Sequence, residues 1–396
     1  MFRLKSGTET VDTRIRESLT RLEAYILGAG YAGYDPYDAL MSPLFRVPFL
    51  RTNRLLRFGA QQVVKRLPVN VRRPLRIPRG RNPVTFGLCL QGFTYLQSLF
   101  PERKEIYDKE AAYCLRMLQE LQSKGYGGAC WGYDFDWESR FASFPAFTPT
   151  VVATGMITNA LFVHHTLTAN AEALDLCRSA VRFVVKDLHR SYDEEMFCFS
   201  YSPRDSQRVL NATMKGARLL IQMYSKTNNE ELKGLASATV RFVLKHQRST
   251  GAWPYTIGDV RSWTDNFHTG YVLDCLDDYV QATHDSSARD ALDKGVAYYR
   301  RSFLQDGILP KYFDNAVYPI DTTAAAQSIL TLARFGFVTD AMAVAGWMID
   351  TMQDREGYFY YRAYHSRVVR TSFMRWSNAW MFLALSYLLY RRHALV

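Results

Sequence analysis

The sequence is poor in the short motifs that mark metal, nucleotide and nucleophile chemistry. Its 396 residues include six cysteines, none in a C-x-x-C pair or a Cys/His metal spacing, which argues against a disulfide scaffold and a structural zinc site. A phosphate-binding glycine loop, a G-x-S-x-G elbow and an H-E-x-x-H pair are also missing. We therefore expect a protein without a metal ion or a cofactor.

Long apolar runs are missing as well. The first residues, Met1–Glu23, mix charges throughout and contain no stretch typical of a secretory signal. The longest apolar stretch near the C-terminus, Ala379–Leu389, is shorter than the roughly 20 residues that span a bilayer. With 48% apolar and 22% charged residues, the composition is that of a soluble globular protein. We expect it in the cytoplasm, able to associate with a membrane surface.

Acidic residues are absent from one segment, Arg51–Arg81, which carries ten basic residues. The formal net charge of the whole chain is +11, so this segment supplies nearly all of the excess. Within it Arg54–Leu67 predicts a helix with Leu55, Phe58, Val63 and Leu67 on an apolar face, and the prolines that follow forbid a longer helix. The segment can be an irregular wrap around the main domain, or it can contact an anionic membrane leaflet or an acidic polymer. Nucleic acid is not an expected partner, because no nucleic-acid-binding motif accompanies the charge.

From about residue 84 onward, a unit of about 50–65 residues repeats. Each unit contains a helix rich in small residues, then an amphipathic helix with apolar residues at three- and four-residue spacing, then a turn that ends in aromatic residues. The small-residue helices are predicted to begin near Val84, Pro149, Leu210, Asp265, Asp321 and Arg375.

The amphipathic helices are predicted to lie between these starts. A sixth comes from the N-terminus, where Asp12–Ile26 has the same pattern and can close a ring. The other five are predicted over Glu105–Gln122, Glu172–Leu188, Glu231–Gln247, Ala288–Leu304 and Thr339–Gln353.

The aromatic turns carry a family resemblance. Two of them follow the pattern Gln-x-x-x-Gly-x-aromatic, at Gln247–Trp253 and Gln353–Phe359. The chain here resembles the α/α-toroid superfamily, which includes terpenoid cyclases, protein prenyltransferases, glycosidases, polysaccharide lyases and uronyl epimerases. The resemblance implies an all-α fold, an (α/α)6 toroid over residues 84–396. Residues 1–83 would then be a helix and a basic irregular segment that pack on it.

Such a ring has a funnel at one end. Small residues let the inner helices approach closely, and each hairpin buries its apolar face only by stacking on its neighbours. The first turns of the inner helices and the aromatic turns line the funnel, so polar residues at those places can meet a ligand. Helix N-termini also favour an anionic ligand.

The first candidate cluster surrounds Asp134 and Asp136. Trp131, Tyr133 and Trp137 flank these carboxylates, a combination that can stack on sugar rings while the carboxylates bind hydroxyls or act as acids. In the alternative interpretation the aspartates cap the next helix or order a loop. Thr150, at the following helix start, belongs to the same group.

The second cluster lies at the fourth inner helix, from Trp263 to Tyr271. Removing the proton next to a uronate carboxylate needs a base of near-neutral pKa and a group that stabilises the enolate. His268 and Tyr271 are the predicted acid and base, Asp265 is the best carboxylate, and Asn266 is a carboxylate contact. On a helix His268 and Tyr271 share a face, whereas Asn266 lies about 200° from His268; in the alternative interpretation His268 is a capping or buried residue.

The last units supply cations and further polar groups. Arg375 can form a bidentate clamp on a substrate carboxylate, or it can be an ordinary ion pair. The remaining predicted ligand contacts are Asn211, Tyr255, Tyr312, Asp321, Tyr361, Arg362 and Asn378.

These residues predict a carbohydrate-active enzyme. The leading hypothesis is C5 proton abstraction, by an epimerase or lyase, on a uronic-acid-containing oligo- or polysaccharide in cell-surface polysaccharide metabolism. One alternative is a glycoside hydrolase that uses Asp134 or Asp136 together with Asp265. The others are a terpenoid cyclase or prenyl-binding toroid, and a non-catalytic glycan-binding protein.

Overall fold

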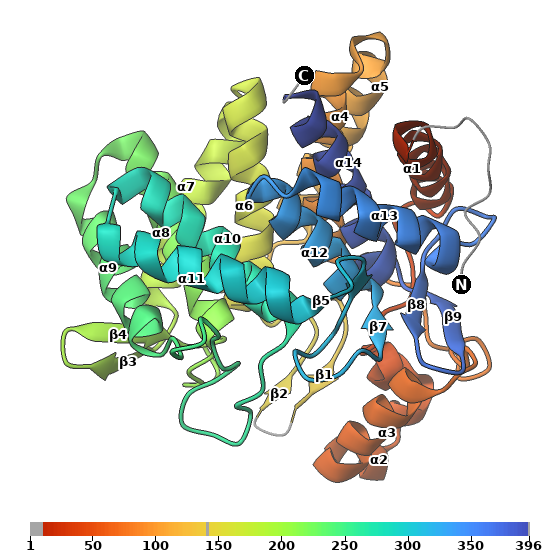
Figure 1. The fold of residues 1–396 in the computed structure, drawn as a ribbon. Helices are drawn as coiled ribbons and strands as arrows, with labels where there is room; N and C mark the ends of the chain where they lie inside the picture. The colour runs from red at the N-terminus through yellow and green to blue at the C-terminus, as the bar shows by residue number, and fades with distance from the viewer. Residues whose placement is uncertain (1–10, 140–141, 395–396) are drawn as a thin grey trace.

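The computed structural model describes residues 11–139 and 142–394 and confirms the predicted all-α toroid (Figure 1). Six inner helices form a closed ring in which each contacts the next and the last contacts the first. Most of their residues are buried, as expected for helices enclosed by neighbours. The inner helices are α4 (Pro83–Leu99), α6 (Val151–Thr168), α8 (Leu210–Thr227), α10 (Asn266–Thr283), α12 (Thr322–Arg334) and α14 (Trp380–His393).

Six outer helices cover this ring. Five of them pack on the inner helix that precedes them, and α1, from the N-terminus, takes the sixth place against α13 and α14. The outer helices are α5 (Lys104–Glu120), α7 (Ala171–Lys186), α9 (Glu230–Lys245), α11 (Ser286–Phe303), α13 (Val338–Met352) and α1 (Val11–Gly28). None of the helices in the described part of the chain is long and apolar enough to cross a membrane.

Inner and outer helices meet in tight turns that the sequence specifies. After α8, Asn228 adopts a left-handed conformation with φ 53°, and the side chain of Asn229 then caps α9. Asn is one of the few residues that tolerate both roles. The same pairing of a left-handed residue with a capping Asn or Asp joins α6 to α7 and α10 to α11.

Short strands gather at the end where the inner helices begin, together with the one-turn helices η1 (Asp38–Met41) and η2 (Pro43–Arg46) and the helices α2 (Pro48–Thr52) and α3 (Arg54–Arg66). All strand pairs are antiparallel. The three hairpins are β1 (Trp137–Glu138) with β2 (Ser143–Phe144), β3 (Arg190–Asp193) with β4 (Met196–Phe199), and β5 (Leu304–Gln305) with β6 (Leu309–Pro310); β7 (Ile320–Asp321), β8 (Tyr360–Ala363) and β9 (Val368–Ser372) form a three-stranded sheet.

One feature differs from the sequence prediction. The last inner helix does not run unbroken from Arg375: a π-helical turn, η4 (Met374–Ala379), precedes α14. The helix predicted at residues 54–67 is present as α3, and Leu55 and Val63 of its apolar face are 83% and 59% exposed.

Small residues allow the inner helices to approach closely, as the sequence predicts. At Gly155 of α6, a Cβ atom would lie 2.6 Å from the Cβ of Lys215 on α8. Gly234 on the outer helix α9 has no such neighbour, since nothing lies within 4 Å of the position of its Cβ.

We expect Gly155→Ala to lower the free energy of unfolding by about 1–3 kcal/mol, because overpacking moves α6 away from α8. Gly234→Ala, the matched control, should raise it by about 0.5–1 kcal/mol through helix propensity alone. Urea unfolding followed by circular dichroism measures both. Equal changes in the two variants would contradict the close packing of the inner ring.

Candidate functional site

A cavity of about 230 Å³ lies where the inner helices begin. Its walls come from aromatic turns and from the first turns of α6, α8 and α10, together with η4 and the start of α14. The structure brings ten of the predicted site residues together here: Tyr133, Trp137, Asn211, Tyr255, Trp263, Asp265, His268, Tyr271, Tyr312 and Arg375.

The carboxylate of Asp265 organises one wall of this cavity. As the N-cap of α10, its Oδ1 accepts the backbone N–H of His268 at 3.0 Å. Its Oδ2 accepts the indole N–H of Trp263 at 3.0 Å and lies 2.7 Å from the imidazole Nδ1 of His268. The Asp265 side chain is 1% exposed and that of His268 is 22% exposed, so the imidazole faces the cavity and the carboxylate lies behind it.

This arrangement fixes which imidazole nitrogen can act. A carboxylate that lies against Nδ1 keeps the proton on that nitrogen, which leaves Nε2 as the acceptor of the neutral ring. The carboxylate also stabilises the imidazolium ion that forms when Nε2 takes up a proton. His268 can therefore serve as a general base and then as a general acid.

Stacked aromatic pairs make two other walls. Tyr255 and Trp263 stack with ring centroids 5.1 Å apart and an interplanar angle of 7°. Tyr133 and Phe135 stack at 5.5 Å and 5°. Flat aromatic faces of this kind suit the apolar faces of sugar rings.

Arg375 is held before any ligand arrives. Its Nε and Nη2 donate to the two carboxylate oxygens of Asp35 at 2.7 and 2.9 Å, and its guanidinium lies 4.7 Å above the ring of Tyr133. The bidentate clamp predicted for a substrate carboxylate is thus occupied by Asp35. The third nitrogen, Nη1, makes no hydrogen bond to a described residue.

Behind Tyr271, a cation–π contact joins α8 to α10. The ammonium of Lys215 lies 3.8 Å from the centroid of the Tyr271 ring, which stacks on Trp380. Burial, with a smaller effect from neighbouring Arg218, lowers the pKa of Lys215 to about 7. Burial also raises the pKa of the Tyr271 phenol well above its usual value, so this group stays protonated.

Asn211 offers a free amide. It is 3% exposed and lines the cavity, yet its Oδ1 is buried without a hydrogen-bond partner among the described residues. A buried polar atom without a partner costs stability unless a ligand or a water molecule satisfies it, so this oxygen points to a ligand donor.

The carboxylates of the first predicted cluster lie elsewhere. Asp134 is turned away from the cavity and accepts a hydrogen bond of 2.6 Å from Asn82; burial raises its pKa to about 6. Asp136 accepts the backbone N–H of Ala146 at 2.9 Å and lies 3.7 Å from Arg57. Neither carboxylate lines the cavity, and each makes a contact that orders its loop.

Three more predicted contacts are structural. Trp131 is fully buried and donates its indole N–H to the carbonyl of Leu118 at 2.7 Å. Thr150 caps α6 by accepting the N–H of Ala153. Asn266 faces away from His268, as its helical angle requires, and is tied to Tyr299 and Ser328.

The last group lies behind the cavity wall. Asp321 caps α12, pairs with Arg362 and accepts the indole N–H of Trp376. Arg362 covers the ring of Tyr312 at 4.8 Å. Tyr361 is 1% exposed. Asn378 accepts the backbone N–H of Phe359, just before β8, and donates to the hydroxyl of Ser372. These residues position the wall without lining the cavity.

Several residues that line the cavity were not among the predicted site residues. Tyr37 contributes its ring against Trp137 and Trp376. The only sequence signal for it is a Tyr-Asp-Pro-Tyr-Asp run at residues 34–38, ahead of the repeats. The other residues that were not predicted are Phe135, Val152, Met156, Tyr201, Phe267, Phe313, Trp376 and Trp380.

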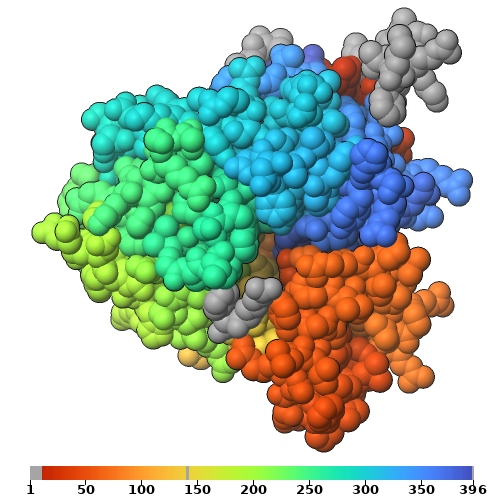
Figure 2. All heavy atoms as spheres, turned by 60° about the horizontal axis from the view of Figure 1, so that its bottom comes forward, coloured from red at the N-terminus to blue at the C-terminus, as the bar shows by residue number. Residues whose placement is uncertain are grey.

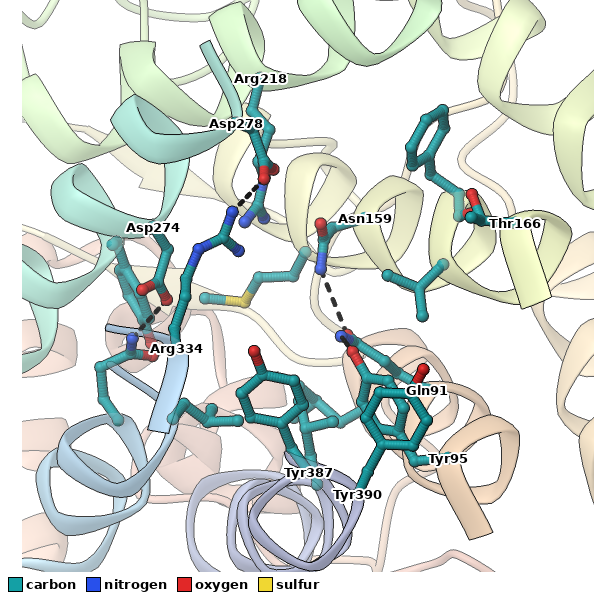
Figure 3. A pocket seen from close by; sticks show the side chains of 18 of the residues that line it. Gln91, Tyr95, Asn159, Thr166, Arg218, Asp274, Asp278, Arg334, Tyr387 and Tyr390 are labelled. Carbon is teal, nitrogen blue, oxygen red and sulfur yellow. Dashed lines mark hydrogen bonds and ion pairs between the residues drawn. The ribbon is translucent and has the colours of Figure 1, made fainter. Parts of the chain in front are cut away.

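A second cavity of about 310 Å³ lies at the opposite end of the ring, where the inner helices finish (Figure 3). Arg334 forms ion pairs with Asp277 and Asp278 of α10, and Asp274 accepts from Gln327 at 2.7 Å, whereas Nε of the lining Arg218 is buried without a hydrogen-bond partner among the described residues. These pairs join α10 to α12 and stabilise the far end of the ring.

No protein-family model matches the chain, and no curated protein matches its sequence. Solved structures do match. The cellobiose 2-epimerase of Bacillus thermoamylovorans B4167 aligns with a TM-score of 0.60 at 14% identity, over 79% of this chain and 88% of that one. The unsaturated glucuronyl hydrolase of Bacillus sp. GL1 aligns with a TM-score of 0.61 at 10% identity, over 96% of both chains.

A GH76 α-mannanase of Bacteroides thetaiotaomicron aligns with a TM-score of 0.58 at 13% identity, over 78% of this chain and 87% of that one. At such low identities the similarity establishes architecture. The chain has the α/α-toroid fold that these carbohydrate-active enzymes share.

Lys215 should give the protein a distinctive pH dependence. Between about pH 7 and pH 10 the lysine is neutral in the folded state and charged in the unfolded state, so the unfolded state binds more protons and stability rises with pH. Lys215→Met should remove this rise and increase the free energy of unfolding at pH 6. Urea unfolding between pH 6 and pH 9 measures the effect, and identical slopes in the two proteins would contradict it.

Proposed function

We propose that the chain is a glycan-active enzyme that transfers protons at the cavity of the inner-helix starts. The observation that carries this proposal is the pair formed by His268 and the buried Asp265. Aromatic walls beside a positioned acid–base group suit a sugar ring. Proteins of the same fold include an epimerase and a hydrolase named for carbohydrate substrates.

Proton transfer fits this cavity better than hydrolysis does. Glycoside hydrolysis generally needs two carboxyl groups about 5–9.5 Å apart across the scissile bond. Of the three aspartates in the hydrolase alternative, Asp265 alone lines the cavity, and both of its oxygens accept N–H groups. Asp134 and Asp136 are engaged outside it.

A uronate is the substrate we propose. His268 Nε2 would remove the C5 proton, and the Nη1 edge of Arg375 would neutralise the charge that develops on the carboxylate. Asn211 Oδ1 would accept a sugar hydroxyl, and the protonated Tyr271 phenol is a donor. In epimerisation the Tyr271 phenol would give a proton to the other face of C5, and exchange with water would return both residues to their starting states. In a lyase reaction the departing C4 oxygen would take its proton from the His268 imidazolium, which leaves an unsaturated product.

The other two hypotheses make different demands on the cavity. A terpenoid or prenyl chain would use the aromatic walls but would leave His268 and the Asn211 oxygen without partners, at a desolvation cost. A glycan-binding protein would hold the sugar by the same aromatic walls and hydrogen bonds but would not catalyse a reaction. The exchange experiment below separates binding from catalysis.

We further propose that the enzyme acts in cell-surface polysaccharide metabolism, with the basic segment Arg51–Arg81 in contact with an anionic surface. The charge of this segment supports such contact.

His268→Gln should lower C5 hydrogen exchange with deuterated solvent by about 10²–10⁴-fold, the usual contribution of a general base. The assay incubates uronic-acid glycans in deuterated water and reads the mass of the recovered glycan. Asp265→Asn should also lower it, because the imidazole then loses the carboxylate that orients it. A matched control is Asp285→Asn, which alters the cap of the outer helix α11 and should leave exchange unchanged. Full exchange in His268→Gln would refute the assignment.

Asn211→Ala should weaken substrate binding without destabilising the protein, because its side chain makes no hydrogen bond within the described residues. We expect KM to rise about tenfold, the equivalent of one hydrogen bond of about 1.4 kcal/mol, with thermal stability unchanged. Asn378→Ala is the contrasting control. It removes two hydrogen bonds and should lower stability by about 1–3 kcal/mol. A loss of stability in Asn211→Ala equal to that control would contradict a ligand role.

A further inference from the structure

Helix α3 packs on the protein through the polar groups of Gln61 and Arg57 and through buried Val64, and it presents three apolar side chains to solvent. Gln61 is 1% exposed; its Nε2 donates to the carbonyl of Tyr37 at 2.7 Å and its Oε1 accepts the N–H of Glu138 at 2.8 Å. Arg57 donates to the buried Glu138 carboxylate at 3.1 Å. The groups that a soluble helix normally shows to water are therefore used to attach α3 to the toroid.

The opposite side of α3 is apolar and exposed. At about 100° per residue, Leu55, Leu56 and Val63 fall on one side of the helix, where they are 83%, 41% and 59% exposed. The preceding helix α2 adds another exposed apolar side chain, Phe49, which is 68% exposed. Seven of the sixteen exposed large apolar side chains in the described part of the chain lie within residues 44–69. Such a concentration marks an interaction surface.

Positive charge surrounds this apolar surface. No acidic residue occurs between Asp38 and Glu102. We call residues 43–79 the basic platform. Its exposed arginines are Arg46, Arg51, Arg54, Arg66, Arg73, Arg76 and Arg79.

The basic platform adjoins the cavity of the proposed active site. Tyr37, which lines that cavity, accepts hydrogen bonds from Gln61 and Lys65 of α3. The carboxylate of Glu138 in β1 accepts hydrogen bonds from Arg54 and Arg57. Figure 2 shows the platform, in orange, projecting from this end of the toroid. A surface that binds the platform therefore lies close to the cavity.

We propose that the basic platform docks on an anionic phospholipid bilayer and that the substrate is a glycan anchored in that bilayer. Apolar side chains flanked by arginines are the features of a segment that lies in a membrane interface, where the apolar groups insert and the cations meet lipid phosphates. The second half of the inference rests on the proposed function, because it assigns a glycan to the cavity.

Other occupants fit less well. An acidic polymer would satisfy the arginines but would leave Leu55, Phe49 and Val63 in water. A second copy of the chain would bring two strongly basic surfaces together, and like charges oppose such pairing. A bilayer satisfies both features at once.

Vesicle sedimentation tests the docking without any glycan. The wild-type chain should sediment with vesicles of phosphatidylcholine and phosphatidylglycerol, less with phosphatidylcholine alone, and less at high salt. Leu55→Ser with Val63→Ser should weaken binding at least about tenfold. Ile106→Ser, an exposed position on α5 at the other end of the ring, should bind as the wild type does.

Three results would overturn the docking proposal: no sedimentation of the wild type, full binding by the double variant, or a wild-type dimer that the double variant dissociates. A separate arm tests the substrate. The double variant should keep full activity on a soluble glycan but lose it on the same glycan anchored to a lipid in vesicles, and equal activity on both would refute the anchored substrate. If no protein acts on either glycan while vesicle binding persists, the proposed function fails and the docking stands.

Discussion

A single buried carboxylate, that of Asp265, determines the geometry of the cavity. It begins α10 by capping it, it holds the imidazole of His268 through Nδ1, and it fixes the indole of Trp263. Helix start, acid–base group and aromatic wall are thereby set by one side chain. Because the carboxylate is removed from water, its hydrogen bonds act in a low dielectric and hold the imidazole firmly.

Buried carboxylates hold side chains at two other helix starts of the ring. Asp321 caps α12 while it binds Arg362 and the indole of Trp376. Asp35, from the segment before the repeats, fixes Arg375 of η4. Six inner helices begin at this end of the toroid. At three of these helix starts, a buried carboxylate holds the neighbouring side chains in place. The basic platform is attached to this end of the toroid through Tyr37 and Glu138, so the proposed membrane contact and the cavity share one support.

The sequence predicted the repeating architecture well, because small-residue helices, amphipathic helices and aromatic turns are local patterns. Helical periodicity also separated His268 and Tyr271 from Asn266. It could not show that Arg375 meets Asp35, since the two are 340 positions apart. Nor could it show that Asp134 faces Asn82, or that α3 packs on the protein through Gln61, since the partners in both cases come from distant segments.

The most direct test of this account is a crystal structure of the protein soaked with a uronic-acid oligosaccharide. We predict a uronate ring in the cavity between the Tyr255–Trp263 and Tyr133–Phe135 stacks, with its C5 hydrogen directed at His268 Nε2 and its carboxylate at Arg375 Nη1. A sugar bound at the far end of the ring, or bound in the cavity with C5 remote from His268, would contradict it.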